Sequence, residues 1–398
     1  MAAHEIGSLF GILCLLLLGS ALSARLISRF RLPSVLGELL FGVLLGTVLA
    51  VGEVDWQRFS SLYFLAEIGV LLLLFEVGLE TSVEDIRKAG SKAALVAVVG
   101  VILPMILGYV LSWSLEVADT WLGHLFLGAT LAATSVGITA RVLKDLGKAS
   151  APESAIILGA AVIDDVLGLV ILGVISALAA QGVGESTVAS ALLLPLAKAV
   201  FYFAAAYAFG RFAIPPFLRF CRKEFGEPGL ILGGLCICLL FGFAAQQCGL
   251  APVVGAFFAG MMTDTNPGAA GHGLEHSLKP LLYIFVPLFF VLTGMGVDLR
   301  LFAEGSALFL TLMLCVVAVA GKLAAGFVLK GGRQRWIVGV GMVPRGEVGL
   351  IFAALGAALQ VDGAPLLSQE AYVAVVAMVA FTTFLAPTWL TLLYRKRS

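Results

Sequence analysis

The sequence predicts an all-α polytopic membrane protein with about thirteen transmembrane helices. Of its 398 residues, 60% are hydrophobic and 13% are charged, whereas about a quarter of the residues in soluble domains are charged. The mean hydropathy is +1.05, and the apolar residues cluster into runs of about 17–25, each long enough to cross a bilayer as a helix. The lipid bilayer is therefore the expected partner. The formal net charge of zero gives no reason to expect a nucleic-acid partner.

The expected spans follow one another along the whole chain, joined by short polar connections. In chain order they cover residues 8–24, 33–50, 61–79, 93–114, 121–142, 153–180, 189–212, 229–247, 250–263, 280–298, 304–326, 336–359 and 370–393. The ninth run is short, so composition defines its ends least sharply.

Basic residues predict how these spans are oriented. Of the 25 Lys and Arg residues, most fall in alternate loops and in the C-terminal tail, while only Arg58 and Arg300 fall in the opposite loops. Cytoplasmic loops carry the excess of basic residues in membrane proteins. The N-terminus is therefore expected outside and the C-terminus in the cytoplasm. This arrangement requires an odd number of spans, as thirteen is.

An internal repeat divides the chain into two halves. The segment "SVLGELLFGVLL" (34–45) resembles "PVVGAFFAGMMT" (252–263) at an offset of 218 positions. The same offset pairs 75–80 with 292–298, which aligns Gly78 with Gly296 and Glu80 with Asp298, and pairs 98–104 with 316–322. Under the expected topology the two copies run in opposite directions, as six helices, a linker helix and six more. Inverted repeats are typical of secondary transporters, although a duplicated bundle need not transport anything.

Two adjacent acids lie inside an apolar run, "GAAVIDDVLGLVIL" (159–172). A charge at the bilayer centre costs about 2.5–3.5 kcal/mol on translocon scales, so Asp164 and Asp165 need a physical reason. Successive helical residues point about 100° apart, so one acid can pair with a base while the other faces a cavity. Lys322, in another span, is the expected partner. The remaining carboxylate is left to bind a proton or a hard cation such as Na⁺.

Two further segments, "ATSVGITAR" (133–141) and "GMVPRGEVGL" (341–350), contain residues that interrupt helices. These are Thr134, Ser135 and Gly137 in the first and Pro344 and Gly346 in the second. Broken helices at membrane depth are tolerated where they line a cavity, and their ends offer carbonyl oxygens to a cation. A simple kink in each helix is the alternative.

The second interrupted segment also carries two charges, Arg345 and Glu347. We expect them to balance the opposing dipoles of the half-helices. Their spacing of two residues places them on different faces of a helix, so a mutual ion pair is not predicted.

The segments "ATSVGITARVLKDLG", "ILGAAVIDDVLGLVIL", "GKLAAGF" and "GMVPRGEVGLIFA" resemble bacterial monovalent cation/proton antiporters, especially the sodium/proton exchangers of the NapA and NhaA kind. The resemblance implies a protein of the bacterial cytoplasmic (inner) membrane that exchanges Na⁺ or Li⁺ for protons electrogenically by alternating access. It implies no enzyme activity and no cofactor. By the same resemblance, Asp165 is the principal ion ligand, Asp164 is the partner of Lys322, and Thr134 lies where the broken helices cross.

The family further implies a homodimer in which scaffold helices carry a mobile core. The corresponding regions are 1–114 (scaffold helices 1–3 and the first core helix), 115–180 (core helices 5–6), 181–228 (linker helix 7), 229–300 (scaffold helices 8–10) and 301–398 (core helices 11–13).

Other functions remain open at this stage. The nearest is a potassium/proton antiporter or a potassium efflux protein of the same superfamily, in which Gln often precedes the Asp and a nucleotide-binding domain follows. Asp164 and the short tail after the last span favour the sodium antiporter, with no soluble nucleotide-binding domain in this chain. A passive channel is a further alternative. An intramembrane aspartyl protease is disfavoured because its acids must face each other from separate helices.

Overall fold

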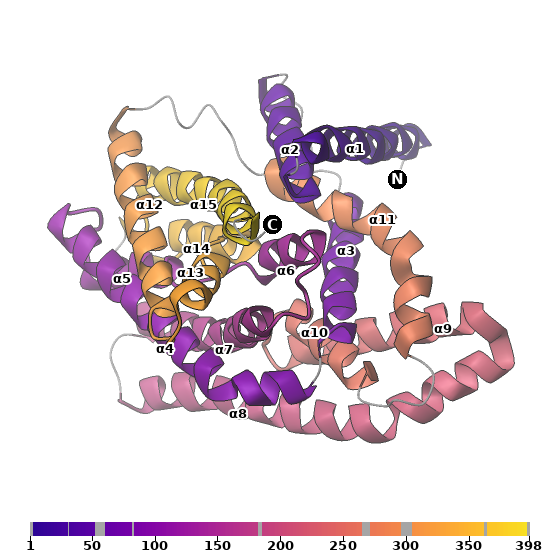
Figure 1. Ribbon diagram of the computed structural model, residues 1–398. Coiled ribbons are helices and arrows are strands. Elements are labelled where there is room, and N and C mark those ends of the chain that lie inside the picture. Colours follow the sequence, from indigo (N-terminus) through magenta and orange to yellow (C-terminus); the bar gives the residue numbers. More distant parts are fainter. Residues whose placement is uncertain are drawn as a thin grey trace.

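The computed structural model describes residues 3–30, 32–51, 60–81, 83–181, 185–264, 271–295, 305–361 and 364–395, and these are almost entirely helical (Figure 1). The helices are α1 (Ala3–Arg29), α2 (Ser34–Val51), α3 (Ser60–Leu79), α4 (Val83–Ser114), α5 (Trp121–Thr130), α6 (Val136–Asp145), α7 (Pro152–Gln181), α8 (Glu185–Phe212), α9 (Ile214–Gln247), α10 (Pro252–Asp264), α11 (Gly271–Met295), α12 (Gly305–Gly326), α13 (Gly332–Gly341), α14 (Glu347–Ala358) and α15 (Gln369–Arg395). A two-residue antiparallel hairpin, β1 (Gln360–Val361) and β2 (Ala364–Pro365), precedes α15.

The helices account for the predicted spans. Within the described residues, nine helices are long and apolar enough to cross a membrane. The shorter helices α2 and α10 and two interrupted pairs, α5 with α6 and α13 with α14, supply the other four expected spans. Large apolar side chains such as Leu22 (69% exposed) and Phe64 (67% exposed) lie on the outer surface, where lipid rather than water is the expected surrounding. The predicted fold class is therefore confirmed.

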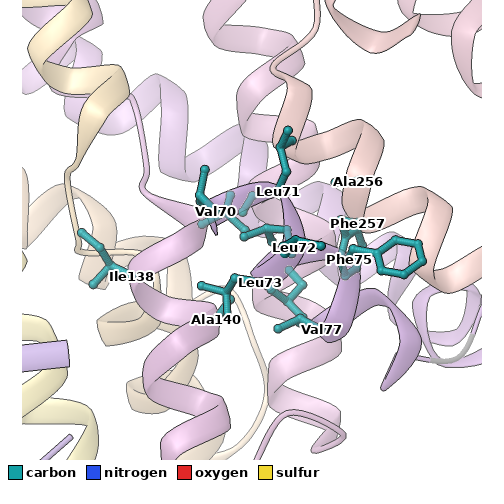
Figure 2. Packing of buried hydrophobic residues seen from close by; sticks show 14 of the residues in the cluster. Val70, Leu71, Leu72, Leu73, Phe75, Val77, Ile138, Ala140, Ala256 and Phe257 are labelled. Atoms are coloured by element: carbon teal, nitrogen blue, oxygen red, sulfur yellow. The ribbon is translucent and has the colours of Figure 1, made fainter. Parts of the chain in front are cut away.

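Helix α3 lies at the centre of the main core cluster. Residues 69–79 of this helix are all buried, and they are apolar on nearly every face, which is typical of a helical segment that is enclosed on all sides. Figure 2 shows its residues Val70 to Val77 between Ala140 of α6 and Phe257 of α10. Helix α11 packs against it as well.

The packing divides the helices into two groups (Figure 1). In the first group, α1, α2, α3, α9, α10 and α11 pack on one another. In the second group, α4 to α7 pack with α12 to α15. Helix α8 contacts α7 of the second group and both α9 and α10 of the first. Apart from α8, the substantial contacts between the two groups in the described part of the chain are those of α6 with α2 and α3.

The repeat is visible in how the helices of the first group pack. Helix α2 lies on α11, and its repeat counterpart α10 lies on α3. A Cβ atom on Gly42 of α2 would lie 2.1 Å from the Val291 carbonyl oxygen, and one on Gly260 of α10 would lie 2.0 Å from that of Phe75. Both crossings therefore require glycine, since only a residue without a side chain permits this approach of the backbones.

The same crossings set the register of the repeat. Gly42 meets Gly294, and Gly260 meets Gly78. The packing therefore pairs Gly78 with Gly294, two residues before the Gly296 expected from the constant offset. Gly296 and Asp298 themselves lie outside the described residues.

Loops that the distribution of basic residues assigns to one side do meet at one end of the molecule. Arg395, at the end of α15, donates to the Phe30 carbonyl after α1 at 3.4 Å. Lys148, which follows α6, lies 6.0 Å from the centre of the Tyr394 ring. Three segments that are distant in sequence therefore share one end of the bundle.

Candidate ion site at the crossing of two broken helices

The fifth and twelfth predicted spans are each broken in the middle. Helix α5 ends at Thr130 and α6 begins at Val136, while α13 ends at Gly341 and α14 begins at Glu347. The two non-helical segments, 131–135 and 342–346, touch: the Ser135 amide donates to the Pro344 carbonyl at 2.8 Å. The broken helices therefore cross at their breaks.

Hydroxyl groups tie the crossing together. Thr139 Oγ1 donates to the Gly341 carbonyl at 2.7 Å, and Thr134 Oγ1 donates to the Met342 carbonyl at 3.4 Å. Both donors belong to the first broken helix and both acceptors to the second. Carbonyl groups released by the second break are thus partly satisfied by the first.

The sequence explains why the second helix stops here. Pro344 has no amide hydrogen, so it cannot continue a helical hydrogen-bond pattern. A Cβ atom on Gly346 would lie 2.5 Å from Ser135 Oγ, so glycine allows the two segments to touch. Gly137 lies at the start of α6, where an added Cβ would lie 3.3 Å from Val70 of α3.

Arg345 is fully buried at this crossing. Its Nη2 donates to the Leu131 carbonyl at 2.5 Å, and its Nη1 donates to the carbonyls of Val343 and Met342 at 3.0 and 3.3 Å. The guanidinium therefore lies at the carboxyl ends of α5 and α13, where unpaired carbonyls concentrate negative partial charge. The side chain of Glu347, the other expected compensating charge, lies outside the described part of the structure.

The paired acids lie on α7 and the lysine on α12. Lys322 Nζ is 2.9 Å from Asp164 Oδ2, and the two side chains are 0% and 1% exposed. Helix α4 borders the lysine at Gly100, where an added Cβ would lie 3.6 Å from Lys322 Nζ, an ordinary van der Waals distance. Asp164 Oδ1 is buried and has no hydrogen-bond partner among the described residues.

Asp165 lies next to this pair and is only partly buried. Its charge is close enough to Lys322 to interact with it electrostatically, and Arg345 is likewise within electrostatic reach of Asp164. Two acids and two bases therefore form one cluster beside the crossing. Because Arg345 is occupied by the helix ends, the carboxylates outnumber the remaining base by one.

This donor set suits a hard cation better than a soft transition metal. The described residues contain no group of three or more His, Cys, Asp or Glu side chains that could hold a metal ion. Carboxylate oxygens, hydroxyls and main-chain carbonyls are what the cluster and the crossing offer. These are also the ligands that a transiently bound alkali cation requires.

Sequence reasoning missed one group of charged residues. The sequence indicated no partners for Arg141 and Lys144, yet both lie in α6, where they pair with acids of α2 and α3. Their spacing of three residues, which places both on one face of a helix, was a signal that could have revealed this.

Comparison with known proteins decides the family. Residues 13–396 match the transmembrane sodium/hydrogen exchanger family. The chain belongs to the sodium/hydrogen exchanger family. The resemblance drawn from its motifs is confirmed.

Several members of the exchanger family are similar along nearly their whole length. The high-affinity Na⁺/H⁺ antiporter NhaS3 of Synechocystis is 35% identical over 93% of this chain and 86% of its own. The Na⁺/H⁺ antiporter of Enterococcus hirae is 33% identical over 95% and 96%. The Na⁺/H⁺-K⁺ antiporter GerN of Bacillus cereus is 34% identical over 95% and 94%.

A solved structure supports the fold of this exchanger. The sodium/proton antiporter MjNhaP1 of Methanocaldococcus jannaschii superposes with a TM-score of 0.68 over 98% of this chain and 99% of its own, at 16% sequence identity.

Proposed function

We propose that the protein is an electrogenic antiporter that exchanges Na⁺ or Li⁺ for protons across a bacterial inner membrane, with both ions competing for Asp165 and Asp164. The observation that carries the proposal is the buried Lys322–Asp164 pair beside the crossing of two broken helices. Relatives that are 33–35% identical over most of the chain are named Na⁺/H⁺ antiporters.

Charge explains why the two ions exchange. With both acids ionised, the cluster formed by Asp164, Asp165 and Lys322 carries one net negative charge, which is costly to move through a bilayer. Binding one Na⁺ at Asp165 makes the cluster neutral. Protonation of both acids leaves it with one positive charge. In both loaded forms every carboxylate is neutralised, by protons or by Na⁺ and Lys322, whereas the empty form leaves one carboxylate without a counter-charge and is held back.

The same count makes transport electrogenic. The proton-loaded cluster carries one more positive charge than the sodium-loaded cluster, so each cycle of two H⁺ against one Na⁺ moves one net charge. Lys322 holds Asp164 in place until sodium binding or deprotonation disrupts the pair. Because protons compete with Na⁺ for the same carboxylates, the apparent affinity for Na⁺ is expected to rise with pH.

The experiment is proton exchange in everted vesicles or proteoliposomes. The parent protein is expected to dissipate a pH gradient on addition of Na⁺ or Li⁺, and Asp165→Asn is expected to abolish this exchange. Glu224→Gln, at an exposed position of α9, serves as the control and should behave as the parent does. Normal exchange in Asp165→Asn would falsify the assignment of the site.

Potassium/proton exchange is the second candidate. One relative, 34% identical over 95% of this chain, is named a Na⁺/H⁺-K⁺ antiporter. The same assay with Na⁺, Li⁺ and K⁺ at several pH values separates the two functions, since a sodium antiporter should give a much weaker response to K⁺.

We further propose that the protein works as a homodimer in the bilayer, with α1–α3 and α9–α11 as the scaffold and α4–α7 with α12–α15 as the moving core. The division of the helices into two groups supports this scheme. Cross-linking in native membranes, followed by mass determination, tests the dimer.

A further inference from the structure

A network of polar side chains lies where α6 meets α2 and α3. Its members, which we call the α6 clamp, are Ser34 and Glu38 of α2, Glu76 of α3, Glu80 directly after α3, and Arg141, Lys144 and Asp145 of α6. All except Glu80 line a cavity of about 410 Å³ that α1 and α11 also border.

Arg141 and Asp145 attach α6 to α2. Arg141 Nη2 lies 3.4 Å from Glu38 Oε1 and 2.9 Å from Ser34 Oγ, and its Nε donates to Asp145 Oδ1 at 3.0 Å. Asp145 Oδ2 in turn accepts from the Ser34 amide at 2.9 Å and from Ser34 Oγ at 2.6 Å. The carboxylate thus caps the first residue of α2.

Lys144 attaches α6 to α3. Its ammonium group pairs with Glu76 and lies 3.3 Å from Glu80 Oε1. Glu76 is 2% exposed, so this pair is shielded from bulk water.

Helix α6 connects the clamp to the ion site. Helix α6 is ten residues long, which corresponds to about 15 Å of helix. Its amino-terminal end follows Thr134 and Ser135 at the crossing, and its carboxyl-terminal end carries the clamp. Helix α6 also provides most of the substantial direct contact between the two helix groups. A displacement at one end of such a short rigid element must reach the other.

Breaking the clamp has a definite electrostatic consequence. Glu38 and Glu76 are each 2% exposed, and each forms an ion pair with a base of α6. A buried carboxylate that loses its base must be neutralised by something else. Separation of α6 from α2 and α3 therefore requires water or cations to enter the cavity beside these acids, which links opening of this end to ion access.

We propose that Arg141 and Lys144 are positioning residues for antiport: they clamp α6, and with it the ion site, against α2 and α3, and the clamp opens whenever the site faces this end of the membrane. The proposal rests on the alternating-access function proposed above. A purely structural network would instead stay closed throughout the transport cycle.

The first test measures access to the cavity. Ser20 of α1 lines the cavity and is 1% exposed. In a chain whose six native cysteines are replaced, Ser20→Cys is labelled with a membrane-impermeant maleimide in vesicles that expose this end. Adding Arg141→Gln and Lys144→Gln is expected to raise the labelling rate about tenfold, the effect of shifting the closed-to-open equilibrium by about 1.4 kcal/mol.

The matched controls separate the clamp from general charge effects. Arg141→Lys keeps the charge but loses the fixed donors that reach Asp145 and Ser34 together, so its rate should lie between those of the parent and of Arg141→Gln. Arg219→Gln removes an exposed arginine that bonds only locally within α9 in the described structure and should leave the rate unchanged. The KM for Na⁺ should change in the double variant more than kcat does. A folded, monodisperse double variant with the parent labelling rate overturns the proposal.

A second test locks α6 to α2 with a covalent link in place of the Ser34–Asp145 contact, which the two cysteines replace. In the same cysteine-free chain, Ser34→Cys and Asp145→Cys are joined by a short thiol cross-linker. Transport should be lost on cross-linking and recovered on cleavage of the linker. Continued transport by the cross-linked protein overturns the clamp but leaves the antiport function standing. If the double variant is labelled faster but the parent shows no sodium-driven proton exchange, the clamp stands and the proposed antiport function fails.

Discussion

A lysine and an aspartate buried together, as Lys322 and Asp164 are, stabilise each other only while both are present. Removal of one partner leaves an uncompensated charge in a medium that solvates it poorly. The neighbouring Asp165 is partly exposed, so an ion can reach it, and it lies close enough to Lys322 to interact with it electrostatically. Two chemically identical side chains thus acquire different environments from a rotation of one residue along α7.

Lys322→Ala is expected to destabilise the protein by about 3–5 kcal/mol, because Asp164 loses its partner. It should also change the voltage dependence of transport, since the base contributes to the charge that moves. Thermal unfolding in detergent and exchange at imposed membrane potentials measure the two effects. Lys198→Ala, at an exposed position of α8, is the control. Unchanged voltage sensitivity in folded Lys322→Ala contradicts the role given to the lysine.

At the scale of the elements, the two broken helices share one positively charged side chain, that of Arg345, which compensates the partial negative charge at their ends. Both breaks leave carbonyl groups that no helix can satisfy, and the Arg345 guanidinium reaches carbonyls of both segments at once. Its planar shape and several fixed donors permit this, whereas an ammonium group offers three donors at a single point. The crossing is thus held by a side chain as well as by the backbone bond between Ser135 and Pro344.

Arg345→Lys is therefore expected to be far from conservative. It keeps the charge but loses hydrogen bonds to one of the two segments, which should lower the free energy of unfolding by about 1–3 kcal/mol. Exchange activity should fall as well. Arg219→Lys in α9 provides the comparison, and equal melting temperatures for the two variants count against the bridging role.

At the scale of the whole molecule, the repeat builds the first helix group from two equivalent crossings. Gly42 and Gly260 permit α2 to touch α11 and α10 to touch α3 at backbone distance. These crossings join one half of the chain to the other, because each pairs a helix of one repeat with a helix of the other. Any side chain added there must push two helices apart.

Two glycine substitutions are expected to have opposite effects. Gly260→Ala places a methyl group against the Phe75 carbonyl and should destabilise the protein by about 1–3 kcal/mol or more. Gly90→Ala in α4 meets nothing within 4 Å and should stabilise the helix by roughly 0.8–1 kcal/mol. Melting temperatures in one detergent compare them. A neutral Gly260→Ala contradicts the close crossing.

Much of this architecture could be predicted because the bilayer leaves few choices. Each span must form its backbone hydrogen bonds within its own helix, so a span appears in the sequence as an uninterrupted run of apolar residues. The spans and the repeat followed from that pattern. The second break was indicated by Pro344 and Gly346, which disfavour a regular helix, and the first by Thr134, Ser135 and Gly137. The structure places Asp164 and Lys322 together as the sequence suggested, while their part in transport stays a prediction.

The register of the repeat and the ion pairs of α6 could not be predicted from the sequence, for a different reason. A constant offset cannot show that the packing pairs Gly78 with Gly294, because that depends on which backbones touch. Arg141 and Lys144 resembled ordinary basic residues at a membrane edge. Their partners, Glu38 and Glu76, lie more than sixty positions away and approach them only in the folded chain.

By itself, the sequence determined that the chain is a duplicated, helical membrane protein with two costly acids in an apolar span, because burial in lipid constrains each segment separately. The tertiary structure alone decided that one arginine serves two helix ends and that α6 is clamped between α2 and α3. These are contacts between distant segments, and their energies depend on distances that no local pattern of residues encodes.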